Sequence, residues 1–397
     1  MDKIIVVVLK KGREQAIKRF HPWIFSGAIK SIEGNPKEGE IVRVVSNCGE
    51  FLALGHYQVG SITIRIVSFE DKRIDHEFWK EQISKAIEVR KSLGLFDSQD
   101  TNVFRLVHGE GDSLPGLIID FYNGTAVIQS HSIGMYNLRN EFAEILHELL
   151  KEKIEAVYFK NNKSLSGKGS KIELENGFYG TDNSKSPVIV KEYGNKFNVD
   201  FIEGQKTGFF IDQRENRHLL MKFAKGKDVL NMFGYTGGFS VNALKGGAKH
   251  VDTVDASAKA MELTDKNVSL NGYLNDHKSF VCDAADFMKD IKDKYNLIIL
   301  DPPAFAKHRS ALSQALQAYK RINQKALEQI RSNGILFTFS CSQVVSKEKF
   351  REAVFSAAAL SKRKVRILYQ LSQPADHPIS IYHPEGEYLK GLVLYVE

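Results

Sequence analysis

The stretch DVLNMFGYTGGFS, residues 228–240, decides the fold of the C-terminal half of the chain. Strand-forming residues lead into a glycine-rich turn from Gly234 to Gly238, and a helical pattern begins directly after the turn. The next strand-like run ends at Asp255, which follows Gly234 by 21 residues (255 − 234). Glycines let the backbone approach a ligand, and an acid at the end of the second strand can accept hydrogen bonds from both ribose hydroxyls. The segment predicts a nucleoside-binding unit, with a tight turn that binds no ligand as the alternative.

The spacing of these glycines also restricts the kind of nucleoside. It is neither GxGxxG nor GxxxxGK[ST], the two patterns that seat phosphate groups on a helix N-terminus. We therefore expect a cofactor without phosphates, and S-adenosylmethionine fits this turn better than NAD or ATP.

Strand-like and helical stretches alternate from about residue 197 onward, and this rhythm sets the fold class. The strand-like runs are residues 228–233, 250–255, 279–282, 296–300 and 334–339. Such alternation predicts an α/β fold with a mostly parallel sheet covered by helices on both faces. The apolar runs LIIL and ILFTF are typical of strands buried on both sides.

The first half of the chain has a different pattern. Short alternating apolar runs separated by Gly, Asn and Pro predict a β-rich domain over residues 1–73. An α+β module is expected over 74–193, with a helix at about 76–93 and another near 135–151. The Lys-, Gly- and Ser-containing stretch 161–171 is expected to be an exposed, mobile, basic loop. The remaining domain is predicted to span 194–397.

Charge and composition narrow the class of partner. The 397 residues include 55 Lys and Arg against 48 Asp and Glu, a net charge of +7. The basic residues cluster at Lys10, Lys11, Arg13, Lys18, Arg19, Lys160, Lys163, Lys168, Lys171, Lys362, Arg363, Lys364 and Arg366. Each cluster alone is typical of a solvated surface, but together they favour a polyanionic partner such as RNA.

The compartment follows from the cysteines and from the apolar runs. Three cysteines without CxxC spacing indicate a reducing cytosol and argue against a structural metal. The longest apolar runs are far shorter than the about 20 residues of a spanning helix. The first residues lack the features of a signal peptide. We expect a cytoplasmic protein without a membrane segment or a metal.

Three carboxylates follow successive strands of the predicted sheet. Asp255, Asp283 and Asp301 each stand at a strand end, where the ligand crevice of an open α/β sheet lies. One such acid is often only a helix cap, whereas three in succession favour a binding site.

The loop DPPAF, residues 301–305, is the more specific signal. Two prolines hold the loop rigid and present Asp301 and an aromatic ring at a fixed place. Such a loop suits a flat substrate such as a nucleobase, although a proline turn that only ends a buried strand has the same pattern.

Cys341 lies in the sequence SCS directly after the fifth strand. A free cysteine is usually buried filler, but a thiol at a strand end beside the DPP loop can attack a base as a nucleophile. Cys48 and Cys282 are expected to be structural.

An ordered set of motifs resembles the bacterial 23S ribosomal RNA cytosine-C5 methyltransferase family, of the large-subunit methyltransferase I type. The set consists of HPWIFSGAI, GEGDSLPGLIIDFY, GQKTGFFIDQRENR, NMFGYTGGFS, DPPAFAK, SCS and PEGEYLKG, and it covers nearly the whole chain. The resemblance implies an N-terminal PUA domain, a middle module and a C-terminal Rossmann-like class I methyltransferase domain with a seven-stranded mixed sheet. It also implies S-adenosylmethionine as cofactor, 23S ribosomal RNA as substrate and a homodimer.

The same resemblance assigns residues. Cys341 is similar to the family's nucleophile, and Asp301 to its partner at the base N3. The residues similar to the family's cofactor site are Phe210, Asp212, Gln213, Arg214, Asn231, Phe233, Tyr235, Gly237, Asp255, Ala256, Asp283, Ala284, Asp301 and Pro302. One departure matters. Better-known RNA cytosine-C5 enzymes carry Pro-Cys in the fourth-strand motif, and here Pro303 follows Pro302. A release step that uses two cysteines therefore cannot operate in this chain.

Several alternatives stay open at the level of sequence. A uridine-C5 methyltransferase would use the same Asp-Pro-Pro loop and Ser-Cys nucleophile. An N-methyltransferase would need an aromatic directly after the prolines, where this chain has Ala304. A non-catalytic RNA-binding protein is the alternative from another class. Asp376 and His377 are either a catalytic base or a loop-capping pair.

Overall fold

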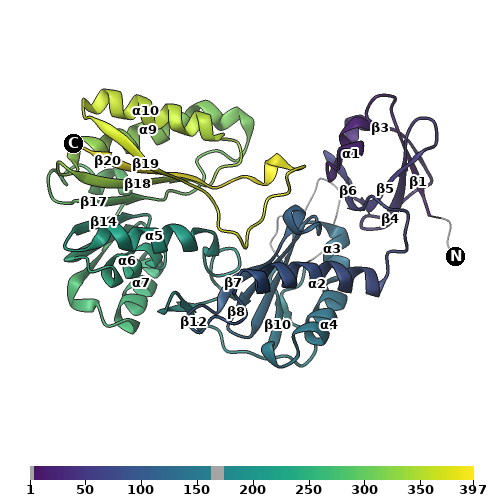
Figure 1. Cartoon of the computed structure of the whole chain (residues 1–397), viewed down its shortest axis with the longest axis horizontal. Coiled ribbons are helices and arrows are strands. Elements are labelled where there is room, and N and C mark those ends of the chain that lie inside the picture. The colour runs from purple at the N-terminus through teal and green to yellow at the C-terminus, as the bar shows by residue number, and fades with distance from the viewer. Residues whose placement is uncertain (1–3, 162–173) are drawn as a thin grey trace. The chain divides into compact units, whose positions relative to one another are not determined.

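The computed structural model describes residues 4–161 and 174–397 of the chain (Figure 1). The chain folds into two units. The first comprises residues 1–188, 199–209 and 375–386, and the second comprises 189–198, 210–374 and 387–397. Two short segments from the C-terminal half therefore belong to the first unit. The division into 1–73, 74–193 and 194–397 remains a prediction.

A six-stranded sheet begins the first unit, in the order β2-β6-β5-β4-β1-β3. Its strands are β1 (Val6–Leu9), β2 (Trp23–Phe25), β3 (Ile29–Glu33), β4 (Ile41–Val45), β5 (Phe51–Tyr57) and β6 (Ile62–Ser68). Alternate residues such as Val7, Leu9, Val42 and Val44 are fully buried, and the short helix α1 (Gln15–Lys18) contributes Ile17 to the same core. The expected β-rich domain is present.

The second sheet of this unit has the order β11-β10-β9-β8-β7. Its strands are β7 (Val103–His108), β8 (Leu117–Tyr122), β9 (Thr125–Ser130), β10 (Ala156–Phe159) and β11 (Gly177–Phe178), and its helices are α2 (His76–Ser92), α3 (Ile133–Asn137) and α4 (Arg139–Leu150). Asp75 caps α2 by accepting a hydrogen bond from the Phe78 amide. The helix expected near 135–151 is instead two helices, because the backbone leaves helical geometry at Leu138. The expected basic loop 161–171 lies outside the described residues, except for Asn161, which is buried.

A buried polar network ties the two C-terminal segments into the first unit. Arg90 is fully buried and binds Asp112 through two hydrogen bonds of 2.5 and 2.8 Å. It also donates to the backbone carbonyl of Asp376 at 2.7 Å. The Asp376 carboxylate accepts from the Arg105 amide, and Thr207 donates to Asp120 at 2.6 Å. Asp376 and Thr207 thus join segments 375–386 and 199–209 to charged groups of the first unit, and such hydrogen bonds contribute about 1.5–3 kcal/mol each.

The second unit contains a seven-stranded sheet in the order β16-β15-β14-β17-β18-β20-β19. Its strands are β14 (Asp228–Met232), β15 (His250–Asp255), β16 (His277–Val281), β17 (Leu297–Leu300), β18 (Gly334–Ser340), β19 (Val365–Leu371) and β20 (Lys390–Val396). Five neighbouring strands are parallel, whereas β20 runs antiparallel to both β18 and β19. This confirms the α/β fold with a mixed seven-stranded sheet.

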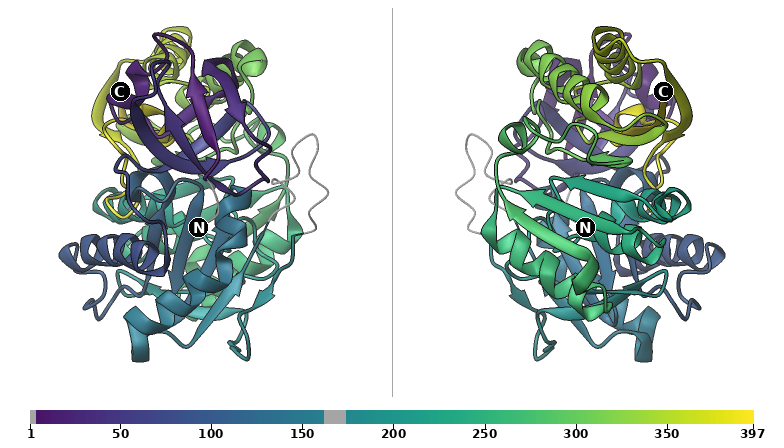
Figure 2. Two further views of the ribbon diagram at one scale, coloured as in Figure 1. Left: turned by 90° about the vertical axis from the view of Figure 1, so that its right-hand side faces the viewer. Right: turned by 90° about the vertical axis from the view of Figure 1, so that its left-hand side faces the viewer.

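Helices cover both faces of this sheet. They are α5 (Arg214–Ala224), α6 (Gly238–Lys245), α7 (Ala258–Leu270), α8 (Ala284–Phe287), α9 (Leu312–Gln329) and α10 (Lys347–Ser361). Helices α9 and α10 lie on one side, and α5, α6 and α7 lie on the other (Figure 1). The right-hand view of Figure 2 shows the same layers. A hairpin of β12 (Val188–Glu192) and β13 (Asn195–Val199) precedes them. Strand order reverses between β14 and β17, which places the ligand crevice of such a sheet at their carboxyl ends.

Among the helices in the described ranges, none combines the length and the apolar character that crossing a membrane requires.

Candidate active site

The glycine-rich turn after β14 has an unusual backbone. Phe233, Tyr235 and Gly237 all have positive φ, at 61°, 47° and 76°. Side chains at such angles cost about 1–3 kcal/mol each, so the surrounding structure must hold Phe233 and Tyr235 in place. A Cβ on Gly237 would lie 2.7 Å from Cγ2 of Thr264. The turn is thus tightly packed and strained, as binding loops often are.

Asp255 ends β15 and is joined to this turn. Its Oδ2 accepts a hydrogen bond of 3.1 Å from the Tyr235 amide, and its Oδ1 accepts one of 3.0 Å from the Ser257 amide. The carboxylate is half-buried, and the neighbouring Ala256 is exposed. A carboxylate can accept about four hydrogen bonds, so both oxygens keep capacity for a ligand.

Asp283 follows β16 and caps the short helix α8. Its Oδ1 accepts from the amides of Ala285 and Asp286 at 2.8 and 3.3 Å. Helix capping therefore occurs here, and it leaves the exposed side chain of Asp283 with further acceptor capacity. Ala284 beside it is half-buried.

The segment before α5 brings another group of predicted residues to the glycine turn. The rings of Phe210 and Tyr235 meet edge to face, with centroids 5.0 Å apart. The Phe210 carbonyl accepts a 2.9 Å hydrogen bond from Arg217. Arg217 is itself bound by Glu192 through two buried hydrogen bonds of 2.8 and 2.6 Å. This buried pair fixes the backbone of Phe210 beside the turn.

Asp212 is the clearest sign of a binding site in that segment. Its side chain is almost fully buried, and Oδ2 accepts a 2.7 Å hydrogen bond from the Tyr388 hydroxyl. Within the described part of the chain, no donor reaches Oδ1. A buried carboxylate oxygen without a donor is costly and complements a cationic ligand. Sequence reasoning missed Tyr388, although it lies in the PEGEYLKG motif.

Three other predicted residues near this segment are also buried. Gln213 accepts a hydrogen bond of 2.6 Å from Asn216, and Arg214 donates to Glu215. Asn231 in β14 donates to Ser240 at 2.8 Å. No donor from the described ranges reaches the Asn231 carbonyl oxygen. The predicted cofactor residues thus include two buried acceptor atoms with spare capacity, one on Asp212 and one on Asn231.

The loops after β17 and β18 contain the predicted reactive residues. The Cys341 thiol is half-buried and lies 4.0 Å from the carbonyl oxygen of Pro302, the residue after Asp301. Ser342 donates a buried 2.6 Å hydrogen bond to the carbonyl of Ala306. These two contacts join the SCS and DPPAFA loops, so Cys341 and the DPP loop are neighbours.

Two residues outside the predicted set also lie at this end of the sheet. Tyr319 in α9 is fully buried. Burial, together with negative charges at Cys341 and Asp301, raises the pKa of Tyr319 to about 12, so its hydroxyl stays protonated at neutral pH. Lys390 at the start of β20 is also buried. Neither position could be predicted from the sequence, because a single Tyr or Lys occurs in buried and in exposed sites alike.

Asp376 and His377, the sequence candidates for a base, belong to the first unit. Both side chains are buried, and His377 Nδ1 lies 3.1 Å from Asp376 Oδ1. Since Asp376 also accepts from the Arg105 amide, the contacts agree with the loop-capping interpretation.

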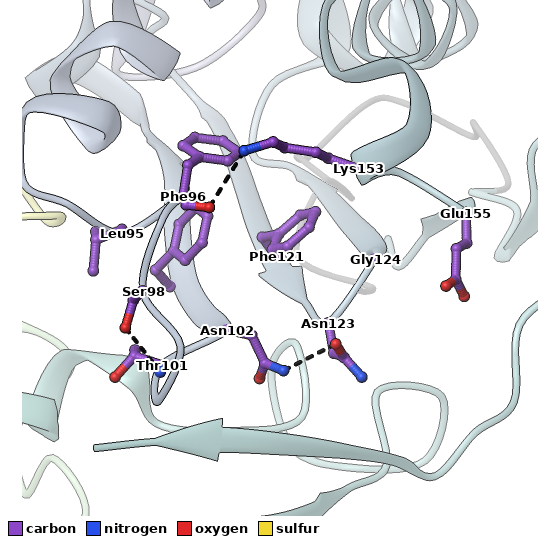
Figure 3. A pocket seen from close by; sticks show the side chains of 11 residues that line it. Leu95, Phe96, Ser98, Thr101, Asn102, Phe121, Asn123, Gly124, Lys153 and Glu155 are labelled. Carbon is purple, nitrogen blue, oxygen red and sulfur yellow. Dashed lines mark hydrogen bonds between the residues drawn. The ribbon is translucent and has the colours of Figure 1, made fainter. Parts of the chain in front are cut away.

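Two further features lie apart from these residues. No group of three or more His, Cys, Asp or Glu side chains in the ranges 4–161 and 174–397 could hold a metal ion. The first unit also contains a pocket of about 250 Å³ (Figure 3). Its lining includes the rings of Phe96 and Phe121 and the side-chain amides of Asn102 and Asn123. It contains none of the predicted cofactor residues.

Comparisons with known proteins agree with this geometry. Residues 7–69 match a family of PUA-like domains, and residues 181–378 match a family of S-adenosylmethionine-dependent methyltransferases. Ribosomal RNA large subunit methyltransferase I from Aeromonas hydrophila is 38% identical over 395 residues, which cover 98% of both chains. The protein of the same name from Tolumonas auensis is 39% identical over 394 residues, again 98% of each chain. The chain belongs to the ribosomal RNA large subunit methyltransferase I family.

Membership of the methyltransferase I family confirms the resemblance seen in the motifs. The protein is an S-adenosylmethionine-dependent methyltransferase of large-subunit ribosomal RNA, with an N-terminal PUA-like domain. Its fold resembles that of a methyltransferase solved in complex with SAH, at a TM-score of 0.85 and 22% identity, covering 99% and 100% of the two chains. Trm5b from Pyrococcus abyssi is more distant, with a TM-score of 0.52 and 17% identity over 100% of both chains.

The residues of this site fit S-adenosylmethionine. The cofactor carries a cationic amino group and donor hydroxyls. The structure offers a buried carboxylate oxygen at Asp212, to which no residue of the described ranges donates, and strand-end carboxylates at Asp255 and Asp283. The strained glycine turn has no phosphate-binding pattern.

Proposed function

We propose that the protein forms 5-methylcytosine in 23S ribosomal RNA through a covalent adduct on Cys341. The observation that carries this proposal is the position of the Cys341 thiol, half-buried and 4.0 Å from the Pro302 carbonyl of the DPP loop. A cysteine that only fills the core is usually fully buried, whereas this thiol is half-buried between two loops at the carboxyl ends of β17 and β18. A nucleophile for a pyrimidine would need this place, because the base and the cofactor must share one crevice.

The cofactor residues then have distinct roles. Asp212 would bind the cationic amino group of the methionine part, next to Asn231 and the glycine turn. Asp255 would accept the ribose hydroxyls, and Asp283 with Ala284 would contact the adenine. The remaining members of the predicted set line this path: Phe210, Gln213, Arg214, Phe233, Tyr235, Gly237, Ala256, Asp301 and Pro302. When bound, the cofactor supplies an electrophilic methyl group.

Cys341 and Asp301 activate the base. Carbon 5 of cytosine is a poor nucleophile, so the Cys341 thiolate first forms a bond to carbon 6. Protonated Asp301 donates a hydrogen bond to N3 and stabilises the electrons that move onto the ring. Carbon 5 then becomes nucleophilic enough to accept the methyl group. Holding the reactants in line contributes up to about 7–11 kcal/mol in well-oriented systems.

Release needs one more proton transfer. A base removes the proton from carbon 5, the double bond between carbons 5 and 6 reforms, and the thiolate of Cys341 leaves. Pro303 occupies the position at which other RNA cytosine-C5 enzymes have a second cysteine. The base is therefore a group other than a thiol of this loop.

The RNA has to present its target base outside a helix, since a stacked base cannot enter a crevice at the end of a sheet. The PUA-like domain and the basic clusters would bind the RNA backbone and recognise its shape. RNA affinity should then fall steeply as salt rises, and an affinity independent of salt would contradict this role.

The test is to offer 23S ribosomal RNA containing 5-fluorocytosine, together with the cofactor. Fluorine at carbon 5 cannot leave as a proton, so the adduct should persist on Cys341 and survive denaturation. Electrophoresis detects the adduct, and peptide mass spectrometry locates it. Cys341→Ala should give none, whereas Cys282→Ala should give as much as the wild type.

The alternatives predict other outcomes. A uridine-C5 enzyme would be trapped by 5-fluorouracil and would yield 5-methyluridine on nucleoside analysis. An N-methyltransferase would keep its activity in Cys341→Ala. A non-catalytic protein would bind no cofactor in a calorimetric titration.

The homodimer and the cytoplasmic location implied by the resemblance are also proposals. Analytical ultracentrifugation of the full chain tests the first, and cell fractionation tests the second.

A further inference from the structure

Lys390 is held directly behind the loop that carries Cys341. It begins β20 and pairs with Ser340, the last residue of β18, in an antiparallel register. Its side chain is 4% exposed. The ammonium group donates hydrogen bonds of 2.5 Å to the Ser342 carbonyl and 2.6 Å to the Val345 carbonyl.

These two carbonyls define the turn that follows the thiol. They lie one and four residues after Cys341, where the chain leaves β18 and turns toward α10. The ammonium group of Lys390 therefore joins both ends of this turn. The Ser342 hydroxyl also binds the turn to the DPPAFA loop by donating to the Ala306 carbonyl. An apolar residue would fill this space at no desolvation cost, so a buried lysine here needs an explanation beyond packing.

The charges around Lys390 indicate what the cation does. Burial lowers the pKa of Lys390 to about 8, and negative charge at Cys341 and Glu387 opposes this shift, whereas Lys347 adds to it. Glu387 forms an ion pair with Lys347. Tyr319 of α9 is also close enough to Cys341 and Asp301 for their charges to raise its pKa. Lys390 is thus a buried cation directly beside the loop that carries the thiol. Electrostatic coupling is reciprocal. If a thiolate at Cys341 stabilises the protonated form of Lys390, then protonated Lys390 stabilises the thiolate by the same free energy.

We propose that Lys390 is a positioning residue for Cys341, which fixes the turn after the nucleophile and stabilises its thiolate. This inference rests on the proposed function, since it assumes that the thiol reacts as a nucleophile. The catalytic groups remain Cys341 and Asp301, and Lys390 acts through Cys341.

The proposal has a defined pH dependence. Below its pKa, Lys390 is charged and favours the Cys341 thiolate. As pH rises through about 8, the ammonium loses its proton and this stabilisation is lost. The Cys341 thiolate should therefore begin to form at a lower pH than it would beside a neutral neighbour. The methylation rate should rise over a broad pH range, because Lys390 loses its proton while the thiol is still titrating.

The experiment measures the alkylation of Cys341 by iodoacetamide in the full-length protein, from pH 6 to pH 10. The thiolate sulfur forms a bond to carbon and iodide leaves, so the rate reports the thiolate fraction. Peptide mass spectrometry separates Cys341 from Cys48 and Cys282. Lys390→Met keeps the length of the side chain and removes the charge, and Lys390→Arg keeps the charge.

We expect Lys390→Met to move the titration of Cys341 to higher pH by about one unit, which lowers its alkylation near pH 7 about 10-fold. Lys390→Arg should retain most of the wild-type reactivity. Lys160→Met is the matched control. Lys160 is also buried and donates to two carbonyls, at 2.7 and 2.6 Å, but Asp200 and Glu203 rather than a cysteine are its charged neighbours. Its loss should leave the Cys341 titration unchanged.

An unchanged Cys341 titration in a folded Lys390→Met protein overturns the proposal, as does an equal shift in Lys160→Met. Circular dichroism and calorimetric titration with S-adenosylmethionine check that each variant is folded. If Lys390→Met does not fold, Lys390→Gln provides the second test. Its side-chain amide can still donate to a carbonyl of the turn but carries no charge, so the Cys341 titration should again move to higher pH. A titration that stays in place in folded Lys390→Gln overturns the proposal.

Failure of this proposal and failure of the proposed function give different results. If the thiol titration shifts but 5-fluorocytosine traps no adduct, Lys390 tunes a cysteine that is not the nucleophile. If the adduct forms and the titration does not shift, Cys341 is the nucleophile without help from Lys390.

Discussion

The two halves of the seven-stranded sheet build their sites in different ways. At the ends of β15 and β16, the carboxylates accept hydrogen bonds from backbone amides that are near in sequence. The donors of Asp255 are 20 and 2 residues away, and those of Asp283 are 2 and 3 residues away. At the ends of β17 and β18, the contacts around Cys341 join residues 39, 36 and 48 positions apart. The strand-end acids of the cofactor half are therefore held by nearby sequence, although Asp212 is bound by Tyr388 from 176 residues away. The reactive half depends on strands that meet only in the folded sheet.

The largest effect should come from Cys341, at the centre of the long-range half. Cys341→Ala should reduce methyl transfer by at least about 10³-fold, because carbon 5 is no longer activated. Cofactor affinity should change less than about 2-fold, because the binding residues stay in place. Transfer of labelled methyl groups to ribosomal RNA and calorimetry measure the two quantities. Cys282→Ala, at the end of the other half, is the control and should stay active; comparable losses in both would remove the distinction between the halves.

Asp301 should have the next largest effect, since it begins the DPP loop that Cys341 contacts through Pro302. Asp301→Asn keeps the shape of the side chain and removes its acidic proton, so the rate should fall about 10²–10³-fold. Single-turnover kinetics with saturating cofactor measure this loss. A variant as fast as the wild type would show that the base needs no proton donor at N3.

Substitution of Asp255 tests the cofactor half of the sheet. Asp255→Ala should weaken S-adenosylmethionine binding about 10- to 100-fold, because a charged acceptor for two hydroxyls is removed. The methylation rate at saturating cofactor should change much less. Asp276→Ala, an exposed aspartate before β16, is the matched control for the loss of charge. If the maximal rate falls with affinity unchanged, the two halves are coupled more closely than their contacts indicate.

The smallest expected effect concerns the backbone of the glycine turn. Gly237 and Gly272 both have positive φ, but a Cβ on Gly272 would meet no atom of the described residues within 4 Å. Gly272→Ala should therefore cost only the conformational penalty of about 1–2 kcal/mol. Gly237→Ala should cost about 1–2 kcal/mol more, because its Cβ meets Thr264. Thermal unfolding of both variants compares the two costs, and equal losses would show that the turn relaxes around the added methyl group.

Features held by contacts that are near in sequence could be predicted from the sequence, and features held by distant contacts could not. The parallel strands, the glycine turn and the acids at the strand ends are visible because their patterns are local. Tyr388 and Lys390 were missed because their partners are 176 and 48 residues away, and no spacing rule reaches so far. For the same reason, no local pattern indicates that segments 199–209 and 375–386 fold with the first unit. The break in the helix near Leu138 was missed because the apolar spacing continues through it.

The place of β20 inside the sheet has a consequence for how the protein is made. This strand follows all the others in sequence, yet it lies between β18 and β19. During synthesis, β18 keeps an open edge until β20 has left the ribosome, and open edges invite pairing with other chains. Lys390 arrives with the same strand, 14 residues after Asp376 (390 − 376). A nascent chain that stalls before this point has neither a closed sheet nor a supported thiol, so assembly and chemical competence are completed together.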